Sequence, residues 1–253
     1  MVVDNIEIRP YFGTELANKL KFELNCLSIA SLYKRNLQNK LISKNHGKAI
    51  IYLSDNQGNT GKQNAVEDLL NIATIQMNFD FANYFKQNAY KKRLLILDEL
   101  HKGAIEIAKH FKWDIKPLNE AYNKCVDAKL ENNWISEKLK TKSSANHKYK
   151  AAVYFEYDNT EIRVYLIIYD KSEKQQQKTL VFTLNGLNRN IMYPDDIMPI
   201  INGKTKWLKD EFILSDKNNR EIGRTKVKET NIKYINEKTN SLVAEKAEKY
   251  LKP

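Results

Sequence analysis

Residues 152–170 read AVYFEYDNTEIRVYLIIYD, in which two runs of alternating apolar residues flank a short polar connection at residues 158–160. A period of two is typical of β-strands, and a brief Asp-Asn-Thr connection between two such runs predicts an antiparallel hairpin. A third alternating run, residues 180–184, follows the polar loop KSEKQQQK. This part of the chain therefore predicts an antiparallel meander.

The predicted meander has two chemically different faces, because successive side chains of a strand point to opposite sides. One face carries Tyr154, Arg163, Tyr165 and Tyr169. Tyrosine beside arginine is typical of the hot spots of protein interfaces, since a rigid ring combines contact area with a polar tip. We predict a partner-binding surface here; the alternatives are that helices cover this face, or that tyrosine is present for its strand propensity. The other face is aliphatic and consists of Val153, Phe155, Val164, Leu166, Ile168, Leu180, Phe182 and Leu184.

The sequence after the meander predicts a further hairpin and a short helix. Residues 211–215 and 221–226 flank the sequence DKNN, which predicts a second hairpin. The stretch SLVAEKAEKYL, residues 241–251, has the pattern of a short amphipathic helix.

The first half of the chain has mostly the helical period. After a short opening strand around Ile6 and Ile8, apolar residues recur at spacings of three and four, which predicts a helix capped by Thr14. The alternation in LKFELNC, residues 20–26, also fits a strand. The remaining patterns predict a buried strand at residues 49–53 and helices at about 64–85, 89–111 and 117–130.

These patterns predict an α+β fold, with a helix-rich N-terminal half followed by an antiparallel β-meander and a short C-terminal helix. The polar stretch EKLKTKSSANH, residues 137–147, has no periodicity and is the best domain boundary in the sequence. We therefore expect a helix-rich region with one or two strands at residues 1–140 and an antiparallel β region at residues 147–253. The alternative is that the two regions form one continuous domain.

Two stretches together resemble the parts of a nucleotide-hydrolysing site. SDNQGNTGKQNAVEDLL, residues 54–70, contains Gly61-Lys62, but a phosphate loop requires glycine where Asn56 stands and a hydroxyl where Gln63 stands. LLILDEL, residues 94–100, would be the metal-binding strand, but its leucines continue a helical stripe without a break. We therefore predict an ordinary turn ahead of a helix in the first stretch, and a helix with solvated acids in the second.

No pattern in the sequence predicts a catalytic, cofactor or metal site. The four histidines are scattered, and Asp98 and Glu106 each precede a histidine on one helix, which is not enough for a metal site built from two helices. Cys26 and Cys125 lie far apart and are expected to be free, buried thiols. We expect no cofactor and lean towards a protein that is not an enzyme.

The formal charge of +11 comes from 42 basic and 31 acidic residues, and it is spread evenly along the chain. Lysine supplies 35 of the basic residues and arginine seven, whereas base and phosphate recognition favours the planar guanidinium. No segment approaches the roughly 18 apolar residues of a membrane helix, and the start of the chain has no secretory pattern. We expect a cytoplasmic protein without a membrane contact.

The sequence thus favours a non-enzymatic protein that binds another protein, with a partner whose surface is acidic. Single-gene immunity proteins that inhibit bacterial toxins are one class with these properties. The alternative is a protein that binds or processes nucleic acid, using the lysine excess and Tyr154, Tyr165 and Tyr169 as stacking platforms.

Overall fold

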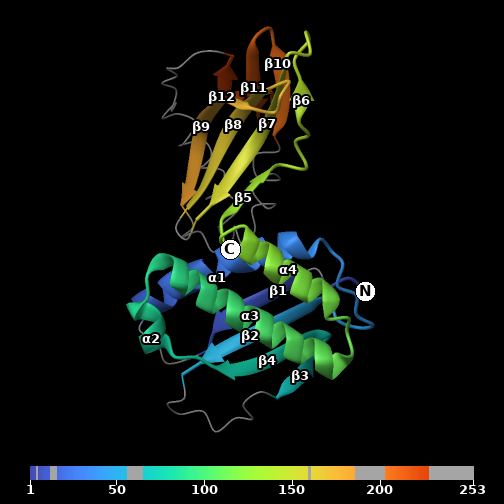
Figure 1. Cartoon of the computed structure of the whole chain (residues 1–253), viewed down its shortest axis with the longest axis vertical. Coiled ribbons are helices and arrows are strands. Elements are labelled where there is room, and N and C mark those ends of the chain that lie inside the picture. Colours follow the sequence, from blue (N-terminus) through green and yellow to red (C-terminus); the bar gives the residue numbers. More distant parts are fainter. Residues whose placement is uncertain (4, 12–15, 56–64, 159–160, 186–202, 228–253) are drawn as a thin grey trace. The chain divides into compact units, whose positions relative to one another are not determined.

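The computed structural model describes residues 1–3, 5–11, 16–55, 65–158, 161–185 and 203–227. The chain divides into two units, Met1–Asn132 and Asn133–Pro253. The sequence predicts a boundary slightly later, between residues 140 and 147. Helices and antiparallel sheets are both present, so the fold class is α+β, as predicted (Figure 1).

The first unit is built on a four-stranded sheet with the order β1-β2-β4-β3. The first three strands in this order are parallel, and β3 is antiparallel at the edge. The sequence predicts only one or two strands in this region, so the unit contains more sheet and less helix than expected. The strands are β1 (Asn5–Pro10), β2 (Lys48–Ser54), β3 (Val66–Leu69) and β4 (Ile72–Asn78).

Of the three long helices of the same unit, the first two pack on the sheet, and all three pack on one another (Figure 1). They are α1 (Leu16–Leu37), α3 (Ala89–Phe111) and α4 (Lys116–Asp127), and a short helix, α2 (Phe81–Lys86), precedes α3. α1 is helical throughout, so the alternative of a strand at residues 20–26 is wrong; Thr14 lies outside the described residues. α3 has the predicted bounds because its N-terminus is capped locally, with the Asn88 side chain accepting a hydrogen bond from Lys91 N.

The core of this unit lies between the helices and one face of the sheet. Alternate strand residues point to this face, and the helices bury their apolar stripes against it. The strand residues concerned are Ile6, Ile8, Ala49, Ile51, Leu53, Ala73, Ile75 and Met77.

The helix predicted at residues 64–85 is wrong. The segment forms the hairpin β3–β4, and only its last residues, from Phe81, are helical. Within β4, Ala73 and Met77 are spaced by four, which brings side chains to one side of a strand as well as of a helix. The segment forms a strand because β4 pairs with β2 on one side and with β3 on the other. The preference of a residue for a strand depends on such neighbours in the sheet.

The second unit contains two antiparallel sheets. Both predicted hairpins are confirmed, whereas β5, β6 and β10 were not predicted. The predicted helix at residues 241–251 lies outside the described residues. One sheet has the order β5-β7-β8-β9 with β6 on β7, and the other β10-β11-β12. The strands are β5 (Asn132–Ile135), β6 (Lys142–Ser143), β7 (Tyr149–Tyr157), β8 (Glu161–Asp170), β9 (Gln175–Asn185), β10 (Lys204–Leu208), β11 (Glu211–Ser215) and β12 (Glu221–Lys226).

β12 lies against β8 and β9 and joins the two sheets of this unit. The Thr179 and Thr225 hydroxyls are 2.8 Å apart, and Gly223 approaches Val181 so closely that a Cβ on the glycine would lie 2.4 Å from Cγ1 of the valine. The core of this unit is mainly aliphatic, and it also contains a stacked pair of Trp134 and Phe155 with ring centroids 4.9 Å apart.

Candidate functional site: a tyrosine face on the second unit

The face of β7, β8 and β9 opposite the aliphatic core carries a set of interacting polar and aromatic side chains. In the register of the hairpin, Tyr154 lies directly opposite Tyr165, and Glu156 lies opposite Arg163. Side chains of directly opposed residues project to the same side of an antiparallel sheet and contact each other. The two tyrosine rings are 6.3 Å apart, centroid to centroid.

Lys178 of β9 lies at the centre of this set. Its Nζ is 4.3 Å from the ring centroid of Tyr165 and 4.9 Å from that of Tyr154, which is within the range of cation–π attraction. The same ammonium pairs with Glu156. We refer to Tyr154, Glu156, Arg163, Tyr165 and Lys178 together as the tyrosine face.

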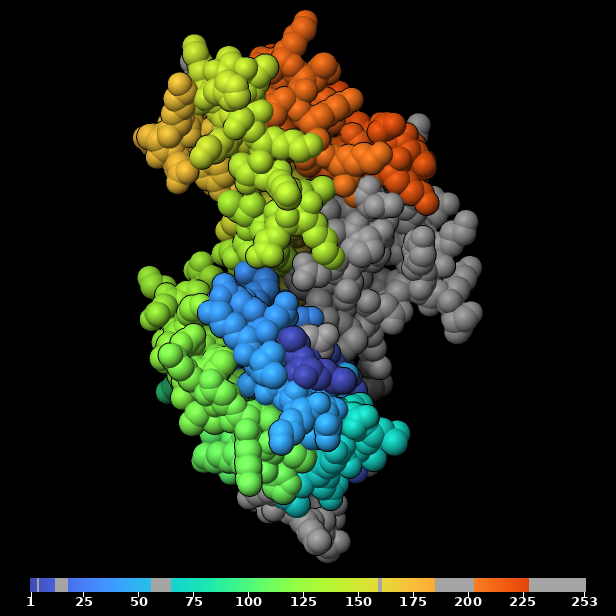
Figure 2. All heavy atoms as spheres, turned by 90° about the vertical axis from the view of Figure 1, so that its right-hand side faces the viewer, coloured from blue at the N-terminus to red at the C-terminus, as the bar shows by residue number. Residues whose placement is uncertain are grey.

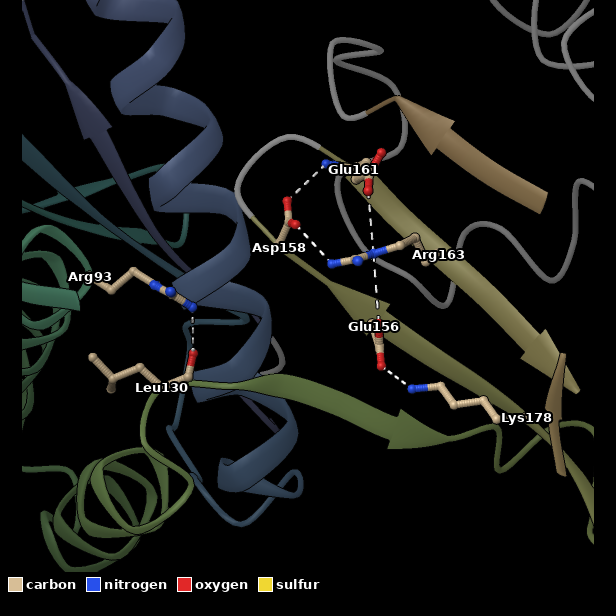
Figure 3. A network of polar contacts seen from close by, with 7 residues as sticks. All are labelled: Arg93, Leu130, Glu156, Asp158, Glu161, Arg163 and Lys178. Atoms are coloured by element: carbon tan, nitrogen blue, oxygen red, sulfur yellow. Dashed lines mark hydrogen bonds and ion pairs between the residues drawn. The ribbon is translucent and has the colours of Figure 1, made fainter. Parts of the chain in front are cut away.

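Arg163 is ion-paired on several sides (Figure 3). Its guanidinium contacts Asp158 at 3.0 Å, Glu161 at 3.3 Å and Glu156 at 3.7 Å. The two cations of the network therefore face three carboxylates, and a phosphate backbone would find no unpaired positive charge on these two side chains.

The network also shifts the pKa values of Glu156 and Tyr165. Burial raises the pKa of Glu156, but hydrogen bonds from Lys178 and Tyr165 and the charges of Lys178 and Arg163 outweigh it, so this pKa is lowered overall. Burial and the hydrogen bond to Glu156 raise the pKa of Tyr165. Near neutral pH, Glu156 is thus a carboxylate and Tyr165 a neutral hydrogen-bond donor.

Of the four residues predicted from sequence, the structure brings three together, namely Tyr154, Arg163 and Tyr165. Tyr169 lies four residues further along β8, about 13 Å from Tyr165 at the rise of a strand. Its neighbours in the register are Lys150 and Gln175, and among the described residues it makes no hydrogen bond or ring contact with the tyrosine face. It is a separate, half-buried position.

Lys178 and Glu156 were not predicted to belong to this site. Glu156 follows from the same alternation as Tyr154, because it lies opposite Arg163 in the regular hairpin, whereas a strand irregularity hides Lys178. The sequence predicts a loop at residues 171–178 and places Leu180 on the aliphatic face with Phe182. In the structure β9 begins at Gln175, and a bulge at Val181 shifts the register, so that Leu180 pairs with Tyr165 and lies on its face. The alternation of β9 changes phase at that point, which a strict period of two cannot reveal.

The two stretches compared with a nucleotide site do not form one. Gly61 and Lys62 lie outside the described residues, but the segment after them is strand β3, whereas a phosphate loop leads directly into a helix. The helix predicted to follow this turn is therefore wrong. Asp98 and Glu99 lie within α3, as predicted, but they are half-buried rather than solvated, and Asp98 accepts a hydrogen bond of 2.8 Å from the Tyr122 hydroxyl.

The histidines and cysteines described next are engaged in packing or in polar contacts within the first unit. His46 is buried against Phe111 and pairs with Asp68 at 3.1 Å, and His101 Nδ1 lies 3.0 Å from the Tyr33 hydroxyl. Cys26 and Cys125 are free and buried, as predicted. Within the described residues, no group of three His, Cys, Asp or Glu side chains could hold a metal ion. None of the described helices combines the length and apolar character that a membrane span requires.

Comparisons with protein families, with curated proteins and with solved structures give no match for this chain. The function is therefore argued from the residues of the tyrosine face.

Proposed function

We propose that this chain acts by binding another protein, and that the tyrosine face is its contact surface. The observation that carries the proposal is the position of Lys178 over both Tyr154 and Tyr165. The lysine, itself paired with Glu156, holds two large rings side by side on a rigid sheet. Rings that are ordered before association lose less conformational entropy on binding, which favours affinity.

The chemistry of the face favours a protein partner over nucleic acid. Lys178 and Arg163 are both occupied by carboxylates, and three acidic side chains surround Arg163. A phosphate would be repelled by these acids, whereas the tyrosines offer apolar area and hydroxyl groups to a protein surface. The acidic partner expected from the net charge of +11 would be attracted by the chain as a whole rather than by this face.

A cytoplasmic immunity-type inhibitor of a bacterial toxin is the narrower form of this proposal. Such a protein acts by covering its partner and needs no catalytic group of its own. A rigid face with fixed aromatic anchors suits that task, because tight inhibition requires well-packed contacts at the centre of an interface.

The test is a pull-down of the tagged protein from a lysate of its own source, with and without nuclease, followed by quantitative mass spectrometry. We expect one stoichiometric protein that survives nuclease and moderate salt, and a roughly tenfold or greater loss of it with Tyr165→Ala or Arg163→Ala. Tyr90→Ala is the control, because Tyr90 is 46% exposed and belongs to the first unit. Recovery of nucleic acid alone, lost on nuclease treatment and at raised salt, would reject the proposal in favour of the nucleic-acid alternative.

A further inference from the structure

An unusual turn connects the two strands of the hairpin β3–β4 in the first unit. Its two loop residues, Leu70 and Asn71, have φ values of 53° and 66°, the conformation of a two-residue turn that strongly prefers Asn and Gly. Leu70 is 89% exposed and Leu69, next to it, is 61% exposed. A leucine in the left-handed region is strained, and its exposure brings no compensating burial within the chain. The stability of the unit therefore does not explain leucine at this position.

No other described strand pairs with the outer edge of β3, the strand that leads into this turn. In a hairpin with a two-residue loop, the pair that closes the loop, Leu69 and Ile72, is hydrogen-bonded and the pairing type then alternates. The backbone groups of Val66 and Asp68 therefore point away from β4. Among the described residues, no hydrogen bond reaches them from any other segment. Figure 2 shows the hairpin, in cyan, at the rim of its unit.

We propose that β3 is a docking edge for an extended, basic segment of a partner protein, with Leu69 and Leu70 as its apolar anchors. The added segment would continue the sheet by hydrogen bonding to Val66 and Asp68, which is a known mode of peptide recognition. This inference shares with the proposed function only the idea of a protein partner, and it rests on different residues in the other unit.

The charge of the edge selects the chemistry of the partner. Glu67 is exposed and has no ion pair among the described residues, while Asp68 is engaged by His46 and by Asn71 N. A lysine or arginine on the incoming segment, opposite Glu67, forms a favourable cross-strand pair. A second copy of this chain is disfavoured, because antiparallel pairing of two β3 strands brings their central acids together.

The test uses random nine-residue peptides displayed on phage and selected on the full-length chain. We expect enriched sequences that alternate apolar residues with Lys or Arg, and bound peptide that slows amide hydrogen exchange at Val66 and Asp68. Leu70→Asn and Glu67→Lys should each lower the affinity for these peptides roughly tenfold or more. Leu70→Asn should also keep or raise the melting temperature, because asparagine tolerates the turn conformation; lost binding then cannot be ascribed to misfolding.

Leu208→Asn is the matched control, since Leu208 is a 53% exposed leucine beside a hairpin turn of the second unit. Peptide binding that survives Leu70→Asn, enrichment of acidic peptides, or no enrichment at all would overturn the docking edge. So would dimers of the chain that Glu67→Lys alters. Tyr165→Ala should leave peptide binding intact, so failure of the tyrosine face and failure of this edge are separate results.

Discussion

Gly103 of α3 lies directly over Ile51 of β2: a Cβ on the glycine would be 2.5 Å from Cγ1 and 2.9 Å from Cγ2 of the isoleucine. The helix thus approaches the sheet at a distance that only glycine permits. Ile51 is fully buried, so it has little space into which to move.

We therefore expect Gly103→Ala to destabilise the first unit by about 1–3 kcal/mol, the usual cost of overpacking a core, despite the better helix propensity of alanine. Lys102→Ala, at the adjacent exposed position, should change stability by no more than about 0.5 kcal/mol. The free energy of unfolding in urea can be measured by monitoring the reactivity of the thiols, because both cysteines of the chain are buried in this unit. An alanine variant as stable as the wild type would show that α3 can move away from the sheet.

The thiols themselves provide the next prediction. Burial raises the pKa of the Cys125 thiol to about 11, and burial and the nearby Glu23 raise the pKa of Cys26 well above its ordinary value. Because the thiolate is the reactive form, both cysteines should react with Ellman's reagent at pH 8 roughly a hundredfold or more slowly in the native protein than in urea. Rapid labelling of the native chain would mean that this unit opens easily.

Local features of the sequence determined which elements could be predicted. The bounds of α3 could be predicted because its stripe of apolar residues lies within one segment, and the Asn88 cap that fixes its start is the residue directly before it. The hairpin β3–β4 was missed because a spacing of four satisfies both periods, and the choice depends on strands β2 and β4 pairing across the sheet. Long-range pairing of this kind leaves no mark on a single segment.

The same limit applies to the tyrosine face. Tyr154, Arg163 and Tyr165 follow from the alternation within one hairpin, whose register a short connection fixes. Lys178 comes from the next strand, beyond a polar loop and a bulge, so its position over the two rings depends on an irregularity that period-two reasoning excludes. Lys178, the central residue of the face, was therefore not predictable, although Tyr154, Arg163 and Tyr165 around it were.

His101 predicts a pH dependence for the first unit. Burial lowers its pKa, while its hydrogen bond with Asn119 and the charge of Asp98 oppose the shift. The folded state thus binds the proton less readily than the unfolded state, so stability falls as the pH drops from about 6.5 towards the lowered pKa and is constant above that window. His101→Gln, which keeps a polar partner for Tyr33, should remove this slope, whereas His110→Gln at an exposed position should not. Unfolding free energies measured in urea between pH 5 and 8 test this; an unchanged slope in the glutamine variant would assign it to another group.

Lys178→Met tests the network of the tyrosine face without requiring a partner. The substitution keeps an apolar stem of similar length and removes the ammonium that pairs with Glu156 and attracts both rings. Since two of the influences that lower the pKa of Glu156 are then lost while burial remains, we expect this pKa to rise in the variant. NMR titration of the glutamate carboxyl groups measures it directly.

The stability of the second unit should follow the same titration. Because the pKa of Glu156 is lower in the folded than in the unfolded state, the wild-type network contributes stability above the ordinary glutamate pKa of about 4.3, and loses it as the pH falls through the lowered value. Lys178→Met should reduce this acid-sensitive contribution, because only the hydrogen bond from Tyr165 and the charge of Arg163 still lower the pKa of Glu156. Lys150→Met is the matched control, since it removes a lysine of the same sheet that pairs with the exposed Glu173 at 3.2 Å. If both variants titrate like the wild type, Lys178 does not hold Glu156 in place, and the two tyrosines lack the ordered arrangement on which binding through this face depends.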